Sequence, residues 1–365
     1  MAQNGLLDVL PAPSPVADLV IGANDVVVHA PGFEERTLAL LDFVRGEPGA
    51  SAILLDYRPY NAANQLSLLR DGLSARGIRA TDSGVIVYDR FDPTTYSEVL
   101  RHRLVERDAQ HAFVDVSTMS KLAVILTLKV CLELDLDLSV LYSEAKSYGP
   151  SREEFEAAKA NNEIHRPTLQ IFTGVHGVVR VGSLASVAMQ GQPTAALVFM
   201  SFNDALTQVL LNTVYPSRLL LINGRPPVHD WREYATAWIH DEVRREWASD
   251  NPIASNGHGG TLPVRAVSTL DYRDTVSLLI ELYWELSETH RVLLAPAGSK
   301  MQAVGCFFAK ALHPDIHIEY PSPEGFLPEY SKGIGQGWLL RLGRMRSLLD
   351  DLATRERRTY LELAV

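Results

Sequence analysis

The chain has 365 residues, of which 46% are hydrophobic and 21% charged, so it is not a disordered protein, and its length predicts two domains. A net charge of -10 at pH 7 argues against a protein that coats nucleic acid through its overall charge, but it leaves room for a local basic pocket. No apolar run reaches the roughly 20 residues that span a bilayer, and the N-terminal residues lack the basic start of a signal peptide. The sequence therefore predicts a soluble, cytoplasmic protein with no membrane contact.

From residue 25 onward, short β-branched runs alternate with segments of helical apolar spacing. The strands expected in the first half are 25–30, 52–56, 84–88, 112–116 and 138–142. The helices expected among them are 34–44, 64–76, 95–107 and 121–134. This alternation predicts parallel β-α-β units with right-handed crossovers, and the continuously apolar strands predict a sheet covered on both faces.

Two elements are expected at the joint between the halves. Residues 151–162 predict a charged helix with Ser151 as its N-cap and Glu154 at the capping-box position. Residues 168–184 are interpreted as a hairpin that turns at His176-Gly177.

The same alternation of strands and helices then restarts in the second half. The expected strands are 196–200, 218–222, 263–267, 292–295 and 316–320. The expected helices are 204–214, 231–247, 275–288 and 302–312, followed by an arginine-rich amphipathic segment at 339–363. The repeated order predicts an α/β fold of two tandem Rossmann-like parallel-sheet domains related by internal duplication.

The predicted domain limits follow from this rhythm. They are an N-terminal extension at 1–24, a first Rossmann-like half at 25–162, a hairpin and linker at 163–195, a second half at 196–338 and a C-terminal helix at 339–365.

Ligands of open parallel sheets bind beyond the carboxyl ends of the strands, where the strand order reverses. The residues that follow the fourth strand of each half are small or polar: Ser117, Thr118, Ser120 and Lys121 in the first, and Gly298, Ser299, Lys300 and Gln302 in the second. At a helix N-terminus, free N–H groups, the helix dipole, hydroxyls and an ammonium all favour an anion. The alternative is that the serines only cap their helices.

Further candidates lie after the first and last strands: Phe33, Arg36, Phe202, Asn203, Tyr330 and Ser331. The two phenylalanines are hypothesised to stack on bases and Arg36 to bind phosphate. The alternatives are core packing of the rings and an ion pair of Arg36 with Glu34 or Glu35. The glycines of 333–337 bring backbone amides close to a phosphate, or form a plain loop.

Several chemistries are disfavoured because their motifs are absent. The sequence has no P-loop, no G-x-S-x-G elbow and no H-E-x-x-H pair. Cys131 and Cys306 lie in apolar segments without a C-x-x-C partner, which predicts buried thiols rather than zinc ligands or a disulfide. We therefore expect no metal and no cofactor, and no catalytic residue is assigned.

The turns Asp115–Lys121 and Ala297–Lys300, each a strand followed by hydroxyls and a lysine, resemble the signature turn of CARF domains. Two such folds in one chain are similar to SAVED domains. The resemblance implies that the chain binds a cyclic or linear oligonucleotide second messenger between its halves, in antiviral defence. No effector domain is recognisable, so the resemblance also implies a separate effector protein.

The leading hypothesis is therefore a sensor of a phosphate-bearing nucleotide or oligonucleotide. One alternative is an enzyme that acts on nucleotides, either a ring-nuclease-like phosphodiesterase or a two-lobed glycosyltransferase. Another is a structural subunit of a defence complex that docks a partner through its C-terminal helix. Ligand identity, ligand cleavage and homo-oligomerisation remain open at this point.

Overall fold

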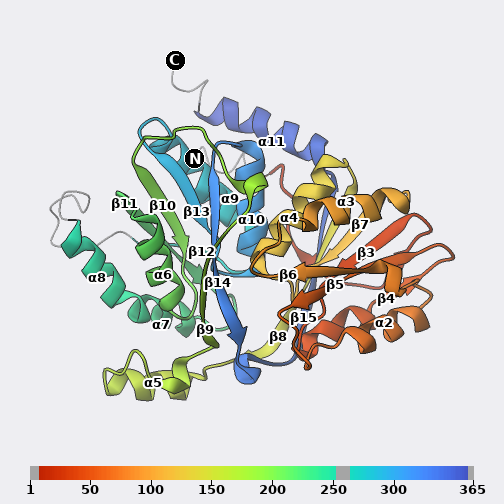
Figure 1. The fold of residues 1–365 in the computed structure, drawn as a ribbon, viewed down its shortest axis with the longest axis horizontal. Coiled ribbons are helices and arrows are strands. Elements are labelled where there is room, and N and C mark those ends of the chain that lie inside the picture. The colour runs from red at the N-terminus through yellow and green to blue at the C-terminus, as the bar shows by residue number, and fades with distance from the viewer. Residues whose placement is uncertain (1–7, 252–263, 361–365) are drawn as a thin grey trace. The chain divides into compact units, whose positions relative to one another are not determined.

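The computed structural model describes residues 8–251 and 264–360, and the chain divides into two units (Figure 1). Unit 1 comprises the chain up to Ser147 and again from Ser331, and unit 2 is Tyr148–Tyr330. Residues 148–162, placed in the first half from the sequence, thus belong to unit 2, and the segment from 331 onward belongs to unit 1. The end of the chain returns to unit 1 because it adds a strand to the first sheet.

Unit 1 is built on a seven-stranded sheet. The elements of unit 1, in which β2 and β4 form a separate two-stranded sheet, are β1 (Ser14–Pro15), β2 (Leu19–Ile21), β3 (Asp25–His29), η1 (Glu35–Asp42), β4 (Val44–Gly46), β5 (Ser51–Arg58), α2 (Leu66–Ala75), η2 (Asp82–Gly84), β6 (Val85–Asp89), α3 (Tyr96–Glu106), β7 (His111–Asp115), α4 (Lys121–Glu133), β8 (Asp137–Tyr148), β15 (Ser331–Arg344) and α11 (Met345–Tyr360). The strand order is β1-β15-β8-β7-β3-β5-β6, and the last five strands of this order are mutually parallel.

The second sheet has six strands. The elements of unit 2 are α5 (Arg152–Ala160), η3 (Pro167–Leu169), β9 (Phe172–Arg180), η4 (Gly182–Leu184), β10 (Thr194–Phe199), α6 (Ala205–Val214), β11 (Arg218–Arg225), α7 (Trp231–Ile239), α8 (Asp241–Asp250), β12 (Val264–Ser268), α9 (Tyr272–Leu286), β13 (Arg291–Ala295), α10 (Lys300–Leu312), β14 (His317–Phe326) and η5 (Pro328–Tyr330). The order is β12-β11-β10-β13-β14-β9, with β9 antiparallel to β14.

The parallel strands of both sheets follow one plan. Numbered in chain order within each unit, they are arranged 3-2-1-4-5 in both. The fold class is therefore confirmed as two Rossmann-like α/β units, and the common order is what an internal duplication requires. In each sheet a further strand, β15 or β9, lies beside the fifth strand.

The core strands are the β-branched and apolar runs of the sequence. Val26, Val27 and Val28 of β3 are buried, because helices cover both faces of a parallel sheet. Leu40 of η1 and Leu69 and Leu73 of α2 pack in a core cluster on one face of the first sheet. Tyr88 of β6 packs against Tyr96 of α3 on the other, with ring centroids 4.9 Å apart.

Some predicted elements were wrong. Residues 172–180 form one strand paired with β14, not half of a hairpin, because Gly177 (φ +145°) lies opposite Ser322, where the register of β14 shifts, instead of forming a turn. The expected helix at 34–44 is the 3-10 segment η1. The expected helix at 231–247 is two helices that divide at His240.

The C-terminal segment also differs from the prediction. Residues 339–344 belong to β15, and the amphipathic helix begins only at Met345. The glycines of 333–337 also lie in β15, where a side chain at Gly335 would come within 3.0 Å of the carbonyl oxygen of Ala145 in β8. They permit close strand packing rather than forming a phosphate loop. In the chain as described, no helix is both long and apolar enough to cross a bilayer.

Candidate functional site

The predicted residues lie at the carboxyl edges of the two sheets, where the strand order reverses. In unit 1 this switch point falls between β3 and β7, and in unit 2 between β10 and β13. The loops that follow these strands carry the candidates in both units. In each unit the topology therefore brings together the two loops that the sequence had singled out separately.

In unit 1 the two loops are joined by hydroxyl groups. Thr118 Oγ1 donates to the carbonyl oxygen of Ala30 at 2.6 Å, and Thr37 Oγ1 donates to Thr118 Oγ1 at 3.2 Å. Ser117 Oγ donates to Asp115 Oδ1 at 2.5 Å and accepts from the backbone N–H of Ser143 at 2.8 Å. The hydroxyls of Ser117 and Thr118 are thus engaged within the protein itself.

Ser120 begins α4, as the capping alternative predicts. Its Oγ accepts from the N–H of Ala123 at 3.1 Å, and its own N–H donates to the hydroxyl of Tyr57 at 2.7 Å. Burial raises the pKa of Tyr57 to about 12, so this phenol stays protonated. Sequence reasoning missed Tyr57 and its neighbour Tyr88. Their signal was a tyrosine near the carboxyl end of a strand beside the switch point.

Lys121, the basic residue of this turn, is largely buried, with only 8% of its surface exposed. Among the described residues, no hydrogen-bond or ion-pair partner of its ammonium is found. Burial lowers the pKa of Lys121 to about 8; the negative charge of Glu34 opposes this shift, and the positive charge of Arg36 adds to it.

Glu34 and Arg36 form a buried ion pair beside this lysine. The guanidinium Nε and Nη2 of Arg36 lie 2.9 and 2.8 Å from Glu34 Oε2, and Nη1 donates to the carbonyl oxygen of Ser143 at 3.2 Å. Ser331 Oγ also donates to Glu34. The ion-pair alternative for Arg36 is therefore correct. With Lys121, the group holds two positive charges and one negative charge out of water.

This burial gives a pH-dependent stability. Because the folded pKa of Lys121 (about 8) lies below its ordinary 10.5, the unfolded chain binds more protons between these values, and stability rises with pH across that window. Lys121→Met should therefore be more stable than the wild type at pH 7, by on the order of 2 kcal/mol, with the advantage shrinking above pH 8. Denaturant unfolding of both proteins at pH 7, 8 and 9 measures this. A difference independent of pH would contradict it.

The corresponding helix of unit 2 has a complete capping box. Ser299 Oγ accepts from the N–H of Gln302 at 3.0 Å, while the N–H of Ser299 donates to Gln302 Oε1 at 2.7 Å. The side chain of Gln302 packs so closely on Gly298 that a Cβ there would clash. Gln302 is 2% exposed, and its Nε2 has no hydrogen-bond partner in the structure. Lys300 is half-buried.

The unit 2 switch point is filled by the unit's own chain. Phe202, which follows β10, and Ala297, which follows β13, belong to one core cluster with residues of α5 and of the segment after it. Asn203 Nδ2 donates to Gln170 Oε1 of that segment at 2.7 Å. The ring of Phe202 lies under the guanidinium of Arg232, 4.2 Å away. Core packing is therefore the correct interpretation of Phe202.

The remaining candidates are divided between the units. Phe33 is half-buried in unit 1, and its carbonyl oxygen accepts from Gln65 Nε2 at 3.2 Å. Tyr330 is half-buried in unit 2, where its ring lies 5.0 Å from that of Phe326. Tyr330 is thus part of an aromatic cluster in unit 2.

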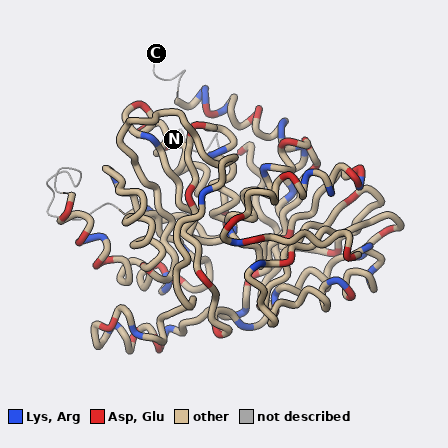
Figure 2. Tube along the Cα trace, viewed as in Figure 1, with Lys and Arg blue, Asp and Glu red and all other residues tan. Residues whose placement is uncertain are grey.

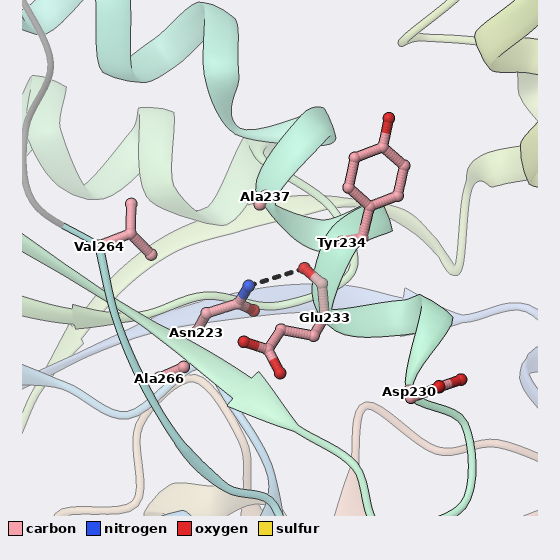
Figure 3. Close-up of a pocket in the computed structure, with 7 residues that line it drawn as sticks. All are labelled: Asn223, Asp230, Glu233, Tyr234, Ala237, Val264 and Ala266. Atoms are coloured by element: carbon pink, nitrogen blue, oxygen red, sulfur yellow. Dashed lines mark hydrogen bonds between the residues drawn. The ribbon is translucent and has the colours of Figure 1, made fainter.

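A pocket of about 390 Å³ lies elsewhere in unit 2, between α7 and the strands β11 and β12 (Figure 3). Its lining residues are Asn223, Asp230, Glu233, Tyr234, Ala237, Val264 and Ala266. Asn223 donates to the carbonyl oxygen of Glu233 at 2.7 Å, and the Glu233 carboxylate pairs with Arg225. Asp230 caps α7. The side chains of Asn223, Glu233 and Asp230 are thus engaged with the protein.

In the described part of the chain, no three or more His, Cys, Asp or Glu side chains gather in a way that could hold a metal ion. Cys131 and Cys306 are buried free thiols, as expected, and burial raises the pKa of Cys131 to about 12.

Among the candidate residues, two are largely buried and lie in the first turn of the helix after the fourth strand. Lys121 in unit 1 is 8% exposed, and Gln302 in unit 2 is 2% exposed and has a buried Nε2 without a hydrogen-bond partner. A comparison with known proteins returned no match to a protein-family model or to a curated protein.

Proposed function

We propose that this protein senses a phosphate-bearing nucleotide, which binds at the switch point of unit 1. The observation that carries the proposal is the side chain of Lys121 in the first turn of α4, which is only 8% exposed and for whose ammonium no hydrogen bond or ion pair is found among the described residues. A buried charge without a partner is costly, and a bound anion would remove that cost.

The surroundings favour an anion over a neutral ligand. Glu34 and Arg36 neutralise each other, so Lys121 leaves the group with a net positive charge. The N-terminus of α4 adds the positive end of the helix dipole and backbone N–H groups at the same place. A phosphate group bound there would also hold Lys121 in its protonated form.

The resemblance to CARF and SAVED domains extends this proposal to an oligonucleotide second messenger and to a role in antiviral defence with a separate effector. The two units have different parts in this proposal. Unit 1 supplies the phosphate site, whereas in unit 2 Phe202 and the segment 148–172 fill the corresponding place. We therefore place the first phosphate contact in unit 1.

One observation favours an enzymatic role as a second candidate. A lysine with a pKa of about 8 exchanges a proton readily near neutral pH, as a general acid or base must. The same site would then cleave a phosphodiester in the manner of a ring nuclease. Chromatography of the ligand after incubation separates the two roles, because a sensor returns it intact.

Lys121→Met tests the site directly. It removes the charge while keeping a long apolar side chain, and we expect the affinity for a bound nucleotide to fall about ten- to a hundredfold. Mass spectrometry of ligands that co-purify with the protein, followed by calorimetric titration of these and of cyclic oligonucleotides, provides the measurement.

Lys129→Met is the matched control, because Lys129 lies on the same helix but pairs with Glu133 at its surface. It should bind like the wild type. Unchanged affinity in Lys121→Met would remove Lys121 from the site, and no binding of any nucleotide by the wild type would refute the proposed function.

A further inference from the structure

Three arginines converge at the amino edge of the first sheet, the edge opposite to the switch point. Arg79 extends this sheet, since it is bridged to Ser51 at the start of β5. Its neighbours Ile78 and Ala80 belong to the core cluster under η1 and α2. Because side chains alternate along a strand, Arg79 is directed to the other face of the sheet, where α3 lies.

Arg103 and Arg107 reach the same place from α3 and its C-cap. They are one helical turn apart, and Arg107 Nη1 donates to the carbonyl oxygen of Arg103 at 2.9 Å. Arg107 Nη2 lies 3.3 Å from the position that a Cβ would take at Gly84, just before β6. That Cβ position is also 2.7 Å from the carbonyl oxygen of Ala52. The backbone N–H of Ala52 in turn donates to the backbone carbonyl oxygen of Arg79. Arg107 thus lies beside the strand pair that carries Arg79.

The cluster has little compensating negative charge. Arg103 pairs with Glu106 at 3.0 Å, whereas neither Arg79 nor Arg107 has a carboxylate within ion-pair distance among the residues that the structure describes. Burial lowers the pKa of Arg107, and the positive charges of Arg103 and Arg79 lower it further, while the charge of Glu106 opposes the shift. Positive and negative residues are interspersed over most of the chain (Figure 2), and the net charge is -10, so three neighbouring guanidiniums with one carboxylate stand out.

We propose that Arg79, Arg103 and Arg107 form a second anion site, which binds a phosphate group independently of the switch point of unit 1. Guanidinium groups present forked pairs of N–H donors that match the oxygens of a phosphate. Three of them around one position suit a small, multiply charged oxyanion, such as inorganic phosphate, pyrophosphate or a phosphate monoester, because its charge offsets their mutual repulsion. Gly84 contributes by leaving room for Arg107.

Pyrophosphate is the probe, titrated calorimetrically into the full chain in phosphate-free, low-salt buffer. We expect Arg79→Gln and Arg107→Gln each to weaken binding at least about tenfold. The control Arg45→Gln should bind like the wild type, because Arg45 is an exposed residue of β4 that forms no ion pair with any described residue. Lys121→Met should also retain this binding, which distinguishes the two sites.

Three outcomes would overturn this proposal. Wild-type affinity in the Arg79→Gln, Arg107→Gln double variant would do so, provided that its thermal melt is normal. Loss of pyrophosphate binding in Lys121→Met alone would place the anion at the switch point instead. Binding of a DNA duplex with a steep salt dependence, but not of pyrophosphate, would assign the arginines to a nucleic-acid surface.

Discussion

Replacing Glu34 by glutamine should destabilise unit 1 by about 3–5 kcal/mol, the usual cost of removing one partner of a buried ion pair. The carboxylate of Glu34 accepts from two nitrogens of Arg36 and from Ser331 Oγ. Its negative charge also opposes the lowering of the pKa of Lys121 by burial. A neutral amide leaves both cations buried without that charge. Of its two terminal atoms, only the amide oxygen accepts hydrogen bonds.

The neighbouring Glu35 is the matched control, since it is exposed in the same segment. Glu35→Gln should change the free energy of unfolding by less than about 0.5 kcal/mol in urea titrations followed by circular dichroism. Phosphate-bearing nucleotide should restore part of the stability lost in Glu34→Gln, because a bound anion supplies the missing negative charge. If Glu34→Gln were as stable as Glu35→Gln, the charge balance inferred for this site would be wrong.

The repeated alternation of strands and helices, and the place of the candidate residues after the strands, could be predicted because they depend on local pattern. β-branched runs such as 25–30 can be recognised from period and composition, and the residues after them must lie at the carboxyl edge of a parallel sheet. The capping boxes at Ser151 and Ser299 are equally local, since each needs only a serine and a glutamate or glutamine three residues later.

What could not be predicted depends on contacts between distant parts of the sequence. β15 follows the whole of unit 2 in the sequence but pairs in the first sheet. The alternation of neighbouring elements therefore does not predict this pairing. Likewise, Lys121 looks like an exposed first-turn lysine until Glu34 and Arg36 are placed beside it. Phe202 looks like a stacking platform until the segment after α5 is packed onto it. Long-range packing determines the burial and the contacts of such side chains, whereas local composition does not.

Arg232 joins the start of unit 2 to its carboxyl edge. Its guanidinium Nη1 donates to the carbonyl oxygens of Tyr148 and Pro150, each at 3.1 Å, and Nη2 donates to that of Gly149 at 3.0 Å. It also stacks on the rings of Phe202 and Trp231. Burial lowers its pKa to about 10, but it remains charged at neutral pH. One side chain therefore fixes three consecutive backbone carbonyls.

Arg232→Met should accordingly destabilise unit 2 by about 3–4 kcal/mol, because the three carbonyls lose a charged donor and the aromatic rings lose their cation. Arg232→Lys should recover only part of this loss, since a single ammonium cannot span carbonyls that a planar fork reaches together. Arg225→Met is the control from the same unit, as Arg225 is exposed and pairs at the surface with Glu233. Thermal and urea unfolding of the four proteins provide the measurement. Full recovery by lysine would show that charge alone suffices, and the fork geometry inferred for Arg232 would then be wrong.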